Sequence, residues 1–388
     1  MKRNKKKMIR AVTVSNSIDF FKEVMLKMNK DGYETIVVTS PGQFLDEFCE
    51  EHPEIQTIEV LMVRHISLIK DCIALCKLID IFIKERPYIV HSMTPKAGLL
   101  CMVAAWLTRV PYRIHTFTGL IWPTAGGMKR KILMFADKIL CFCATHINPE
   151  GQGVLNDLKS HGVCKKPMKV IGYGNVMGVD LERFNPKRFK RKDKDSFSFL
   201  FIGRIARDKG VNELIDAFVR LQQKFDNITL TLIGGNEKDL DPISTEAEEQ
   251  INNNPAINYC GTKFNDDLLA YYVDADCFVM PSYREGFPNT VLEAGAMGLP
   301  QVVTDINGSR EIVVEVVQED DQIRICKNGI IVPSKDSRRL CKAMELMLSD
   351  SRLRSEMASN ARVMIASRFE KSYVQSCQIQ FYNEIMNK

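Results

Sequence analysis

EGFPNTVLE, residues 285–293, follows a short apolar run that closes at Pro281. The apolar run predicts a buried strand, and Pro288 predicts the first turn of a helix, where its missing N–H costs nothing. Glu285 is then expected in the loop at the carboxyl end of a strand, and Glu293 nearly two turns into the helix. Free N–H groups of a first helical turn attract anions. The stretch indicates a site for a sugar nucleotide, although two acids beside a helix start can also be merely solvated.

A second strand and loop of the same kind lie upstream. Residues 197–202, FSFLFI, predict a strand, and Gly203–Gly210 then leads into a helix with apolar residues at helical spacing. Arg204 and Lys209 lie on this loop, at the sheet edge where open α/β folds bind ligands. Arginine can fork onto a diphosphate, and lysine acts as a mobile point charge. Two cations and two acids on neighbouring loops predict a single pocket.

Strands and helices alternate through both halves of the chain, which predicts two doubly wound parallel sheets. A glycine-rich turn, 172–180, and a charge-dense stretch, 187–195, separate the halves, so we expect domains at 1–185 and 196–388. The last of three closing helices should run from about residue 370 to 386. The expected strands are 8–14, 35–39, 55–60, 88–91, 112–117, 145–148, 169–171, 197–202, 228–235, 257–260, 276–280 and 301–304.

The composition is that of an ordinary globular protein, with 388 residues, 45% of them apolar and 26% charged. The 12 cysteines are scattered without a Cys-x2-Cys pair, and no secretory leader is recognisable, so we expect a reduced cytosol. Cys141, Cys143 and His146 could be imagined as metal ligands. Positions two apart on a helix point in different directions, however, which argues against that interpretation.

Positive charge is concentrated in two places, although the net charge is only +5. Lys129–Lys131 precedes the apolar residues ILMF, and no apolar stretch reaches the roughly 18 residues that a spanning helix needs. Basic clusters beside apolar positions favour peripheral contact with anionic lipid, while a solvated surface is the alternative. Nucleic acid is not an expected partner, because stacking aromatics are not interleaved with the basic runs. The second cluster comprises Lys2, Arg3, Lys5, Lys6, Lys7 and Arg10.

Several motifs together resemble the donor site of family 4 retaining glycosyltransferases, and the likeness runs from about residue 8 to the C-terminus. In the second half they are Gly203-Arg204-x4-Lys209-Gly210, Pro281-Ser282-x2-Glu285–Thr290, Glu293-Ala294, and the flanking Tyr259–Thr262, Gly298–Pro300 and Asn328–Pro333. In the first half, Met62-x-Arg64-x-Ile66-Ser67-x3-Asp71, His91-Ser92-x-Thr94–Leu99 and Arg113–Gly119 are similar to the branch that extends lipid-linked oligosaccharides. That branch serves bacterial capsule, O-antigen and N-glycan assembly.

The resemblance implies the GT-B fold, in which two Rossmann-like domains face each other across a cleft and the last helix crosses back to the first domain. It also implies roles for individual residues. Glu285 and His115 are the expected catalytic residues, and Glu293 is expected to hold the ribose. Arg204 and Lys209 would bind the donor diphosphate, Glu285, Gly286, Phe287, Pro288 and Asn289 the donor sugar, and Gly261, Thr262, Lys263 and Phe264 the base.

On the acceptor side, the expected residues are Ser15, Asn16, His91 and Lys96. The first strand of the family often ends in glycines, whereas this chain has none there, which suggests side-chain contacts from Ser15 and Asn16. Asp274-Ala275-Asp276 matches a metal-binding pattern of the other large glycosyltransferase fold, but a strand start explains it better. No metal is expected, because cations and helix amides can meet the charge of the leaving diphosphate.

The expected activity is retaining transfer of a hexose or N-acetylhexosamine from a UDP-sugar to a lipid-diphosphate-linked saccharide, without a cofactor. The enzyme would be cytoplasmic and peripheral on the inner face of the bacterial plasma membrane. Nucleotide-sugar 2-epimerases share the fold and remain an alternative, as does an inactive binding subunit. The connection 315–327 is longer and more acidic than the family pattern, and we assign it no role.

Overall fold

The computed structural model describes residues 6–63, 65–264 and 266–386. The chain divides into unit 1, residues 1–177 with 372–388, and unit 2, residues 178–371. The expected domain end at residue 185 lies inside unit 2. The reason is local pairing: the Val179 N–H donates to the Phe369 carbonyl at 2.8 Å, and the Lys371 N–H donates to the Val179 carbonyl at 3.0 Å.

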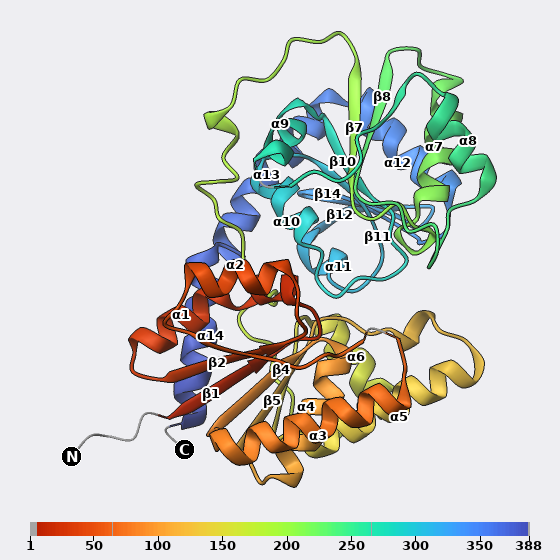
Figure 1. Cartoon of the computed structure of the whole chain (residues 1–388). Helices are drawn as coiled ribbons and strands as arrows, with labels where there is room; N and C mark the ends of the chain where they lie inside the picture. The colour runs from red at the N-terminus through yellow and green to blue at the C-terminus, as the bar shows by residue number, and fades with distance from the viewer. Residues whose placement is uncertain (1–5, 64, 265, 387–388) are drawn as a thin grey trace. The chain divides into compact units, whose positions relative to one another are not determined.

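Unit 1 is built on a parallel six-stranded sheet with the order β3-β2-β1-β4-β5-β6 (Figure 1). Its strands are β1 (Lys7–Ala11), β2 (Glu34–Thr39), β3 (Gln56–Glu59), β4 (Ile89–Met93), β5 (Tyr112–Phe117) and β6 (His146–Pro149). Its helices are η1 (Ser15–Phe20), α1 (Lys22–Lys30), α2 (Gln43–Glu51), α3 (Leu68–Glu85), α4 (Pro95–Leu107), η2 (Trp122–Thr124), α5 (Gly127–Cys143), α6 (Gln152–Ser160) and α14 (Lys371–Met386).

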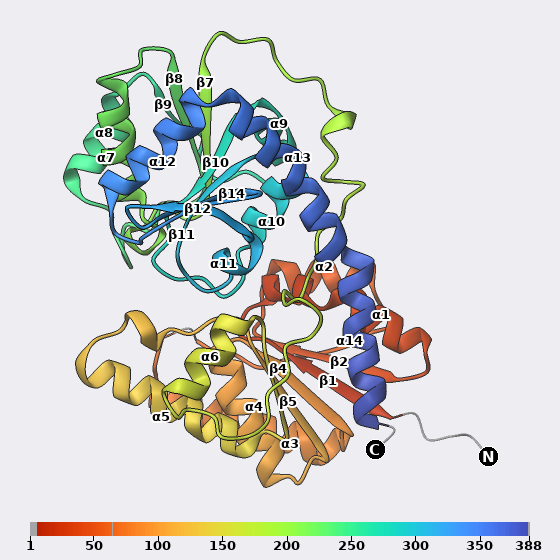
Figure 2. The ribbon, with the colours of Figure 1, turned by 180° about the vertical axis from the view of Figure 1, so that it is seen from behind.

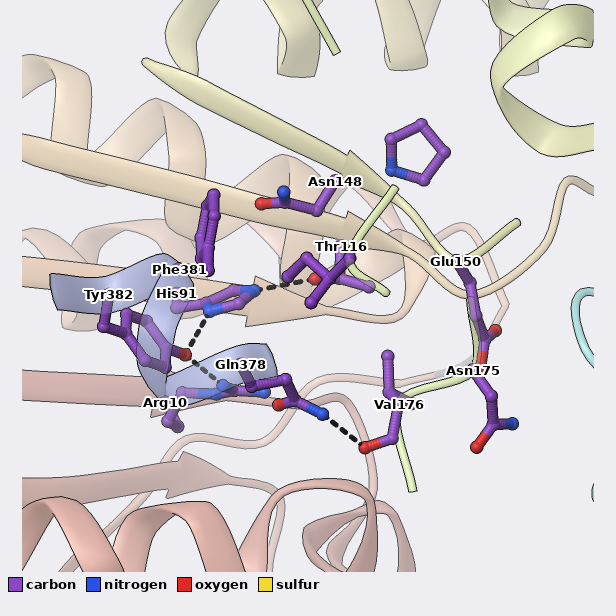
Figure 3. A pocket seen from close by; sticks show the side chains of 12 residues that line it. Arg10, His91, Thr116, Asn148, Glu150, Asn175, Val176, Gln378, Phe381 and Tyr382 are labelled. Carbon is purple, nitrogen blue, oxygen red and sulfur yellow. Dashed lines mark hydrogen bonds between the residues drawn. The ribbon is translucent and has the colours of Figure 1, made fainter. Parts of the chain in front are cut away.

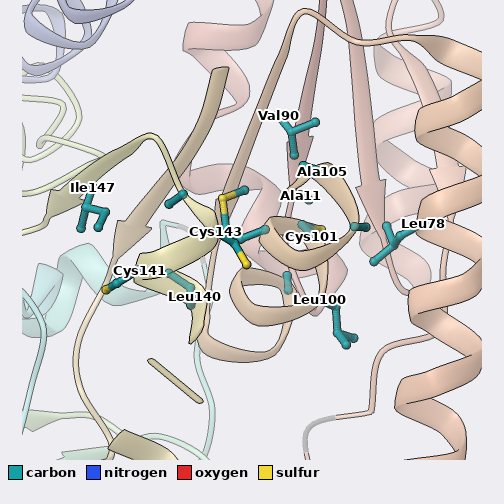
Figure 4. Packing of buried hydrophobic residues seen from close by; sticks show 14 of the residues in the cluster. Ala11, Leu78, Val90, Leu100, Cys101, Ala105, Leu140, Cys141, Cys143 and Ile147 are labelled. Atoms are coloured by element: carbon teal, nitrogen blue, oxygen red, sulfur yellow. The ribbon is translucent and has the colours of Figure 1, made fainter. Parts of the chain in front are cut away.

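The core of unit 1 has a part on each face of this sheet. One part joins the sheet to α3, α4, α5 and α6, and the other joins it to α1, α2 and α14, which Figure 2 shows from behind. Because the sheet is covered on both faces, β1 and β4 are buried along nearly their whole length, even at the polar residues Arg10, His91 and Ser92. Cys101, Cys141 and Cys143 belong to the first part (Figure 4), and burial raises the pKa of the Cys101 thiol to about 12.

Unit 2 is built on an eight-stranded sheet with the order β12-β13-β14-β11-β10-β7-β8-β9. Its strands are β7 (Phe197–Ile202), β8 (Ile228–Ile233), β9 (Ile257–Tyr259), β10 (Cys277–Met280), β11 (Gln301–Thr304), β12 (Val316–Asp320), β13 (Ile323–Cys326) and β14 (Gly329–Val332). Its helices are η3 (Pro186–Arg188), η4 (Arg207–Lys209), α7 (Val211–Gln222), α8 (Thr245–Asn253), α9 (Asp267–Asp274), α10 (Asn289–Ala296), α11 (Ser309–Ile312), α12 (Ser337–Ser349) and α13 (Ser351–Arg368).

The parallel strands of both sheets confirm the predicted α/β class, but one hairpin was not predicted and one predicted strand is wrong. The connection 315–327 forms an antiparallel hairpin, β12 and β13, beside β14. The expected strand at 169–171 is wrong, because only an isolated bridge joins Ile147 to Met168 there. No helix in the described part of the chain is both long and apolar enough to cross a membrane.

Both sheets reverse strand order at one point. In unit 1 the reversal lies between β1 and β4, and in unit 2 between β10 and β7. Open α/β folds bind ligands at the carboxyl ends of the strands at such a switch point. The loops after β7 and β10, and those after β1 and β4, are therefore the positions where ligand-binding side chains are expected.

Candidate functional site

In unit 2, the loops after β7 and β10 are held against each other by backbone contacts. Gly210 has φ +71°, and a Cβ placed on it would lie 2.0 Å from the Pro281 carbonyl oxygen. The Tyr283 N–H donates to the Asp208 carbonyl at 2.8 Å. Only glycine satisfies both the positive φ and this close approach. The fold therefore fixes the loop of Arg204 and Lys209 relative to the loop of Glu285.

Lys209 and Glu285, predicted separately to bind the donor, form an ion pair in the structure. The Lys209 ammonium lies 2.5 Å from Glu285 Oε1, and the side chains are 17% and 14% exposed. An ammonium has three N–H donors and a carboxylate about four acceptor sites, so the pair keeps capacity for a ligand. Because the charges are partly removed from water, they act on a bound ligand more strongly than exposed charges would.

Arg204 lies beside a second cation in the same two loops. Asp208 Oδ2 accepts from Arg204 Nη2 at 3.3 Å and from Arg284 Nη2 at 2.9 Å. A further contact of 3.6 Å joins Arg204 to Glu237. The Arg204 side chain is 42% exposed, so its guanidinium remains accessible to an anion. The arrangement therefore presents two guanidinium groups next to the Lys209–Glu285 pair.

Glu293 lies deeper, in α10. Tyr272, a fully buried side chain, donates its hydroxyl to Glu293 Oε2 at 2.8 Å. Burial raises the pKa of the Glu293 carboxyl to about 7, although the Tyr272 bond and the charge of Arg183 oppose the rise. Because Pro288 precedes the helix, Glu293 is its fifth residue and stands little more than one turn in, not nearly two.

The remaining predicted donor residues divide into buried and exposed groups. Phe287 and Pro288 are buried, and the Phe287 ring packs on Phe369 at 5.3 Å, so these two residues shape the loop. Gly286 and Asn289 are partly exposed. In the segment predicted to bind the base, the carbonyl of Gly261 accepts from the Gly234 N–H at 2.9 Å, which ties this loop to the end of β8. Thr262 and Phe264 are exposed, and Lys263 is partly exposed.

Asp274 and Asp276 are both engaged by cations of the stretch that precedes β7. Asp276 bonds to Arg191 and lies 2.9 Å from the Lys194 ammonium, while Asp274 lies 3.0 Å from the Lys192 ammonium. Among the described residues, no three His, Cys, Asp or Glu side chains gather as a metal site would require. Metal independence nonetheless stays a prediction that only an activity measurement can test.

In unit 1, His115 lies in β5, two residues before the strand ends, beneath α4. Its Nδ1 is 2.9 Å from Ser92 Oγ, and a Cβ on Gly98 would lie 2.4 Å from the ring. The helix can pass over the imidazole only because residue 98 is glycine. Burial lowers the pKa of His115 to about 3, which a bond with Ser92 only partly opposes. The low pKa leaves the imidazole neutral at physiological pH, so it can take part in hydrogen bonds but contributes no positive charge.

The loops after β1 and β4 meet around Thr13. Its hydroxyl lies 2.7 Å from the Thr94 hydroxyl and accepts from the Ala97 N–H at 3.1 Å. Of the predicted acceptor residues nearby, Ser15 is partly exposed and Asn16 is exposed, both in the first turn of η1.

Lys96, another of the predicted acceptor residues, belongs to α4. It lies in the first turn of that helix. Its ammonium contacts both Asp71 oxygens, at 2.7 and 2.5 Å, and donates to the His65 carbonyl at 2.9 Å. Asp71 therefore balances its charge. Arg64, from the same motif as Asp71, lies outside the described residues.

His91, the other predicted acceptor residue, belongs to a buried polar network against α14 (Figure 3). Its Nδ1 lies 2.6 Å from the Tyr382 hydroxyl and its Nε2 2.8 Å from the Thr116 hydroxyl. The Arg10 guanidinium bonds to the same Tyr382 hydroxyl. Burial, followed by the charge of Arg10, keeps the pKa of His91 well below its usual range. With both ring nitrogens engaged, His91 holds α14 to the sheet, and we do not retain it as an acceptor residue.

Comparison with known proteins identifies the family. Residues 182–364 match the model of Glycosyl transferases group 1, and residues 20–174 match the Glycosyl transferase 4-like domain. The chain is 30% identical over 389 residues to the capsular polysaccharide biosynthesis glycosyltransferase CapM of Staphylococcus aureus, with 98% of each chain covered. It belongs to the family 4 glycosyltransferases.

Two further relatives of this glycosyltransferase are informative. It is 27% identical over 323 residues to the UDP-Gal:alpha-D-GlcNAc-diphosphoundecaprenol alpha-1,3-galactosyltransferase of Escherichia coli, which covers 79% of this chain and 78% of the relative. The crystal structure of Anabaena Alr3699/HepE in complex with UDP superposes with a TM-score of 0.74 at 18% identity, covering 99% and 100% of the two chains. The fold is therefore GT-B.

Sequence reasoning missed three residues around the predicted donor residues of the glycosyltransferase: Asp208 contacts Arg204, Arg284 contacts Asp208, and Tyr272 contacts Glu293. Asp208 and Arg284 occupy unassigned positions within the two donor motifs, next in sequence to Lys209 and Glu285, and this adjacency could have identified them. No sequence pattern could have identified Tyr272, because it lies on α9 and contacts Glu293 only in the folded structure.

Proposed function

We propose that the enzyme is a retaining glycosyltransferase that moves a hexose or N-acetylhexosamine from a UDP-sugar to a lipid-diphosphate-linked saccharide, in bacterial surface polysaccharide or glycan assembly. The observation that carries the proposal is the Lys209–Glu285 pair beside Arg204 and Arg284, on the two loops at the switch point of unit 2. The names of the relatives support it, since one makes capsular polysaccharide and another uses UDP-Gal with a diphosphoundecaprenol acceptor.

Each side chain then has a chemical task. Arg204 and Lys209 bind the diphosphate and neutralise the charge that develops on it as the sugar leaves, which is the largest contribution many enzymes make. The second carboxylate oxygen of Glu285 accepts hydrogen bonds from sugar hydroxyls, and Glu293 accepts them from the ribose. Retention follows when the acceptor hydroxyl attacks on the face that the phosphate leaves, and the departing phosphate oxygen takes its proton.

The acceptor lipid requires the enzyme to reach a membrane, and α5 is suited to that contact. Its exposed apolar side chains recur at helical spacing, and exposed lysines flank them. An amphipathic helix with this pattern lies in the headgroup region of an anionic bilayer. The apolar residues are Met128, Ile132, Phe135 and Phe142, which are 68%, 51%, 64% and 65% exposed, and the lysines are Lys129, Lys131 and Lys138.

The decisive experiment incubates the purified protein with labelled UDP-sugars, with and without membrane lipid extract. Label that moves to lipid only when extract is present supports transfer, and the anomeric configuration of the product, read by NMR, tests retention. An isomerised UDP-sugar would instead identify a 2-epimerase, and binding without turnover would identify an inactive subunit. Activity lost with EDTA and restored by manganese or magnesium would refute metal independence.

A further inference from the structure

A small cavity lies in unit 1 beneath the loop that joins β5 to η2, at the carboxyl edge of β4 and β5. Its volume is about 20 Å³, which is room for one water-sized group. Asp137 and Thr118 contribute polar walls, and Phe117 and Leu133 contribute apolar ones. His115, the predicted catalytic histidine, lines the same cavity. The cavity is thus mixed in polarity and borders the expected site of reaction.

Asp137 reaches this cavity from α5 and is only partly satisfied by protein groups. Its Oδ2 accepts the indole N–H of Trp122 at 3.1 Å, the one hydrogen bond that a described residue gives it. A carboxylate has about four acceptor sites. Trp122 does not depend on this bond for its position, because its ring also packs edge-on against His161 at 4.8 Å and beneath the Arg130 guanidinium at 5.7 Å. A carboxyl group with spare acceptor capacity therefore faces a space the size of a hydroxyl.

We propose that the cavity receives one hydroxyl group of the acceptor saccharide and that Asp137 accepts its hydrogen bond. The inference rests on the proposed function and names a binding residue that the family motifs do not contain. A saccharide presents hydroxyls next to apolar C–H faces, which matches the mixed walls. The helix itself links lipid and sugar, since Leu133 and Asp137 are one turn apart on its inner side while Ile132 and Phe135 are exposed.

The carboxyl group should titrate in the physiological range. Burial raises the pKa of Asp137 to about 7, against the lowering effect of the Trp122 bond. The titratable or charged groups near Asp137 or its tryptophan are His115 on β5, His161 after α6, and Arg130 and Cys141 on α5. His115 stays neutral because burial lowers its pKa to about 3. The ionised form of Asp137 is the better acceptor, so acceptor use should improve as pH rises through about 7.

The first test compares wild type with Asp137→Asn, which keeps the shape and an acceptor for Trp122. We expect KM for a soluble lipid-diphosphate saccharide to rise on the order of 10–100-fold with little change in kcat. The wild-type kcat/KM should rise with pH through about 7, and the variant profile should be flat. The kcat/KM of His161→Gln should still rise with pH as in wild type, and Asp137→Glu should show part of this pH dependence. Hydrolysis of the UDP-sugar without acceptor should be equal in all variants.

The second test uses acceptors that lack one hydroxyl at a time. One of these deoxy acceptors should have a lower kcat/KM than the full acceptor with wild type but not with Asp137→Asn, because the variant already lacks the carboxylate that binds the missing hydroxyl. Wild-type transfer combined with an unchanged KM and pH profile in Asp137→Asn would overturn the inference, and so would penalties that simply add for every deoxy acceptor. If wild type itself transfers to no lipid-linked acceptor, the proposed function fails instead.

Discussion

Lys209 and Glu285 are 76 positions apart in the chain and lie on different loops. Both side chains are largely buried, and each stabilises the other's charge. Glu285→Gln and Arg204→Ala should each lower kcat on the order of 10²–10³-fold, because each removes a preorganised group that meets donor charge or hydroxyls. Neither side chain fills the core, so thermal unfolding should change little. Arg220→Ala, which changes an exposed side chain on α7 of the same unit, is the matched control and should keep full activity. Near-normal turnover of Glu285→Gln would refute the site.

Glu293 carries a second prediction, because burial raises its pKa from 4.5 to about 7. Below pH 4.5 the carboxyl is neutral in both folded and unfolded chains. Between the unfolded pKa of 4.5 and the folded pKa of about 7, only the folded chain keeps the proton. The free energy of unfolding therefore falls as pH rises through this range, and it has fallen by the full amount above pH 7. Glu293→Gln removes this loss. Its Tm relative to wild type should be higher at pH 8 than at pH 5, by about 2–4 °C for each kcal/mol, and its UDP affinity should be lower and independent of pH. A Tm difference that is equal at both pH values would contradict the assignment.

At the scale of elements, prediction from sequence succeeded where a segment's own pattern decides its structure. CFVM is apolar throughout and FSFLFI is apolar apart from Ser198, as expected for strands covered on both faces, so β7 and β10 and the loops after them could be placed. The hairpin β12–β13 was missed because β12 is exposed along its whole length and carries no apolar alternation. The His91–Tyr382 contact joins residues 291 positions apart, so no local sequence pattern predicts it. From the sequence alone, His91 was therefore interpreted as a candidate acceptor residue at the end of a predicted strand.

The close approach of the two donor loops requires glycine at position 210. Gly210→Ala places a Cβ within 2.0 Å of the Pro281 oxygen, so the loop after β7 must shift and carry Lys209 away from Glu285. UDP-sugar affinity, measured by calorimetry, should fall at least 10-fold. Gly162→Ala is the control, because Gly162 also has a positive φ, +62°, but a Cβ there meets nothing within 4 Å. That variant should lose about 1–2 kcal/mol of stability through backbone strain alone. Equal donor affinity in both variants would show that the loop contact is dispensable.

For the whole molecule, the two units would carry different partners: the predicted donor residues lie in unit 2, and the helix proposed to contact lipid and the predicted acceptor residues lie in unit 1. Binding to vesicles should therefore depend on unit 1 alone. Lys129, Lys131 and Lys138 of α5 are exposed, and each contributes on the order of 1 kcal/mol near an anionic surface. Salt screens this attraction over roughly 8–10 Å. The protein should pellet with anionic vesicles at low salt and be released by high salt without detergent.

Replacing those three lysines by serine should weaken binding to anionic vesicles about 100-fold at low salt, since about 3 kcal/mol of attraction is removed. Arg130 is left unchanged because its guanidinium lies over Trp122. The control replaces Lys187, Lys190 and Lys224, exposed lysines of unit 2, and should bind normally.

The apolar residues of α5 give a separate prediction. Ile132→Ser with Phe135→Ser should weaken binding at every salt concentration, because burial of apolar area in the bilayer is not screened. Both α5 variants should slow transfer to a long-chain lipid acceptor more than to a short-chain analogue.

If wild type binds neutral and anionic vesicles equally, and salt does not change this binding, then the lysines of α5 face water and do not contact lipid.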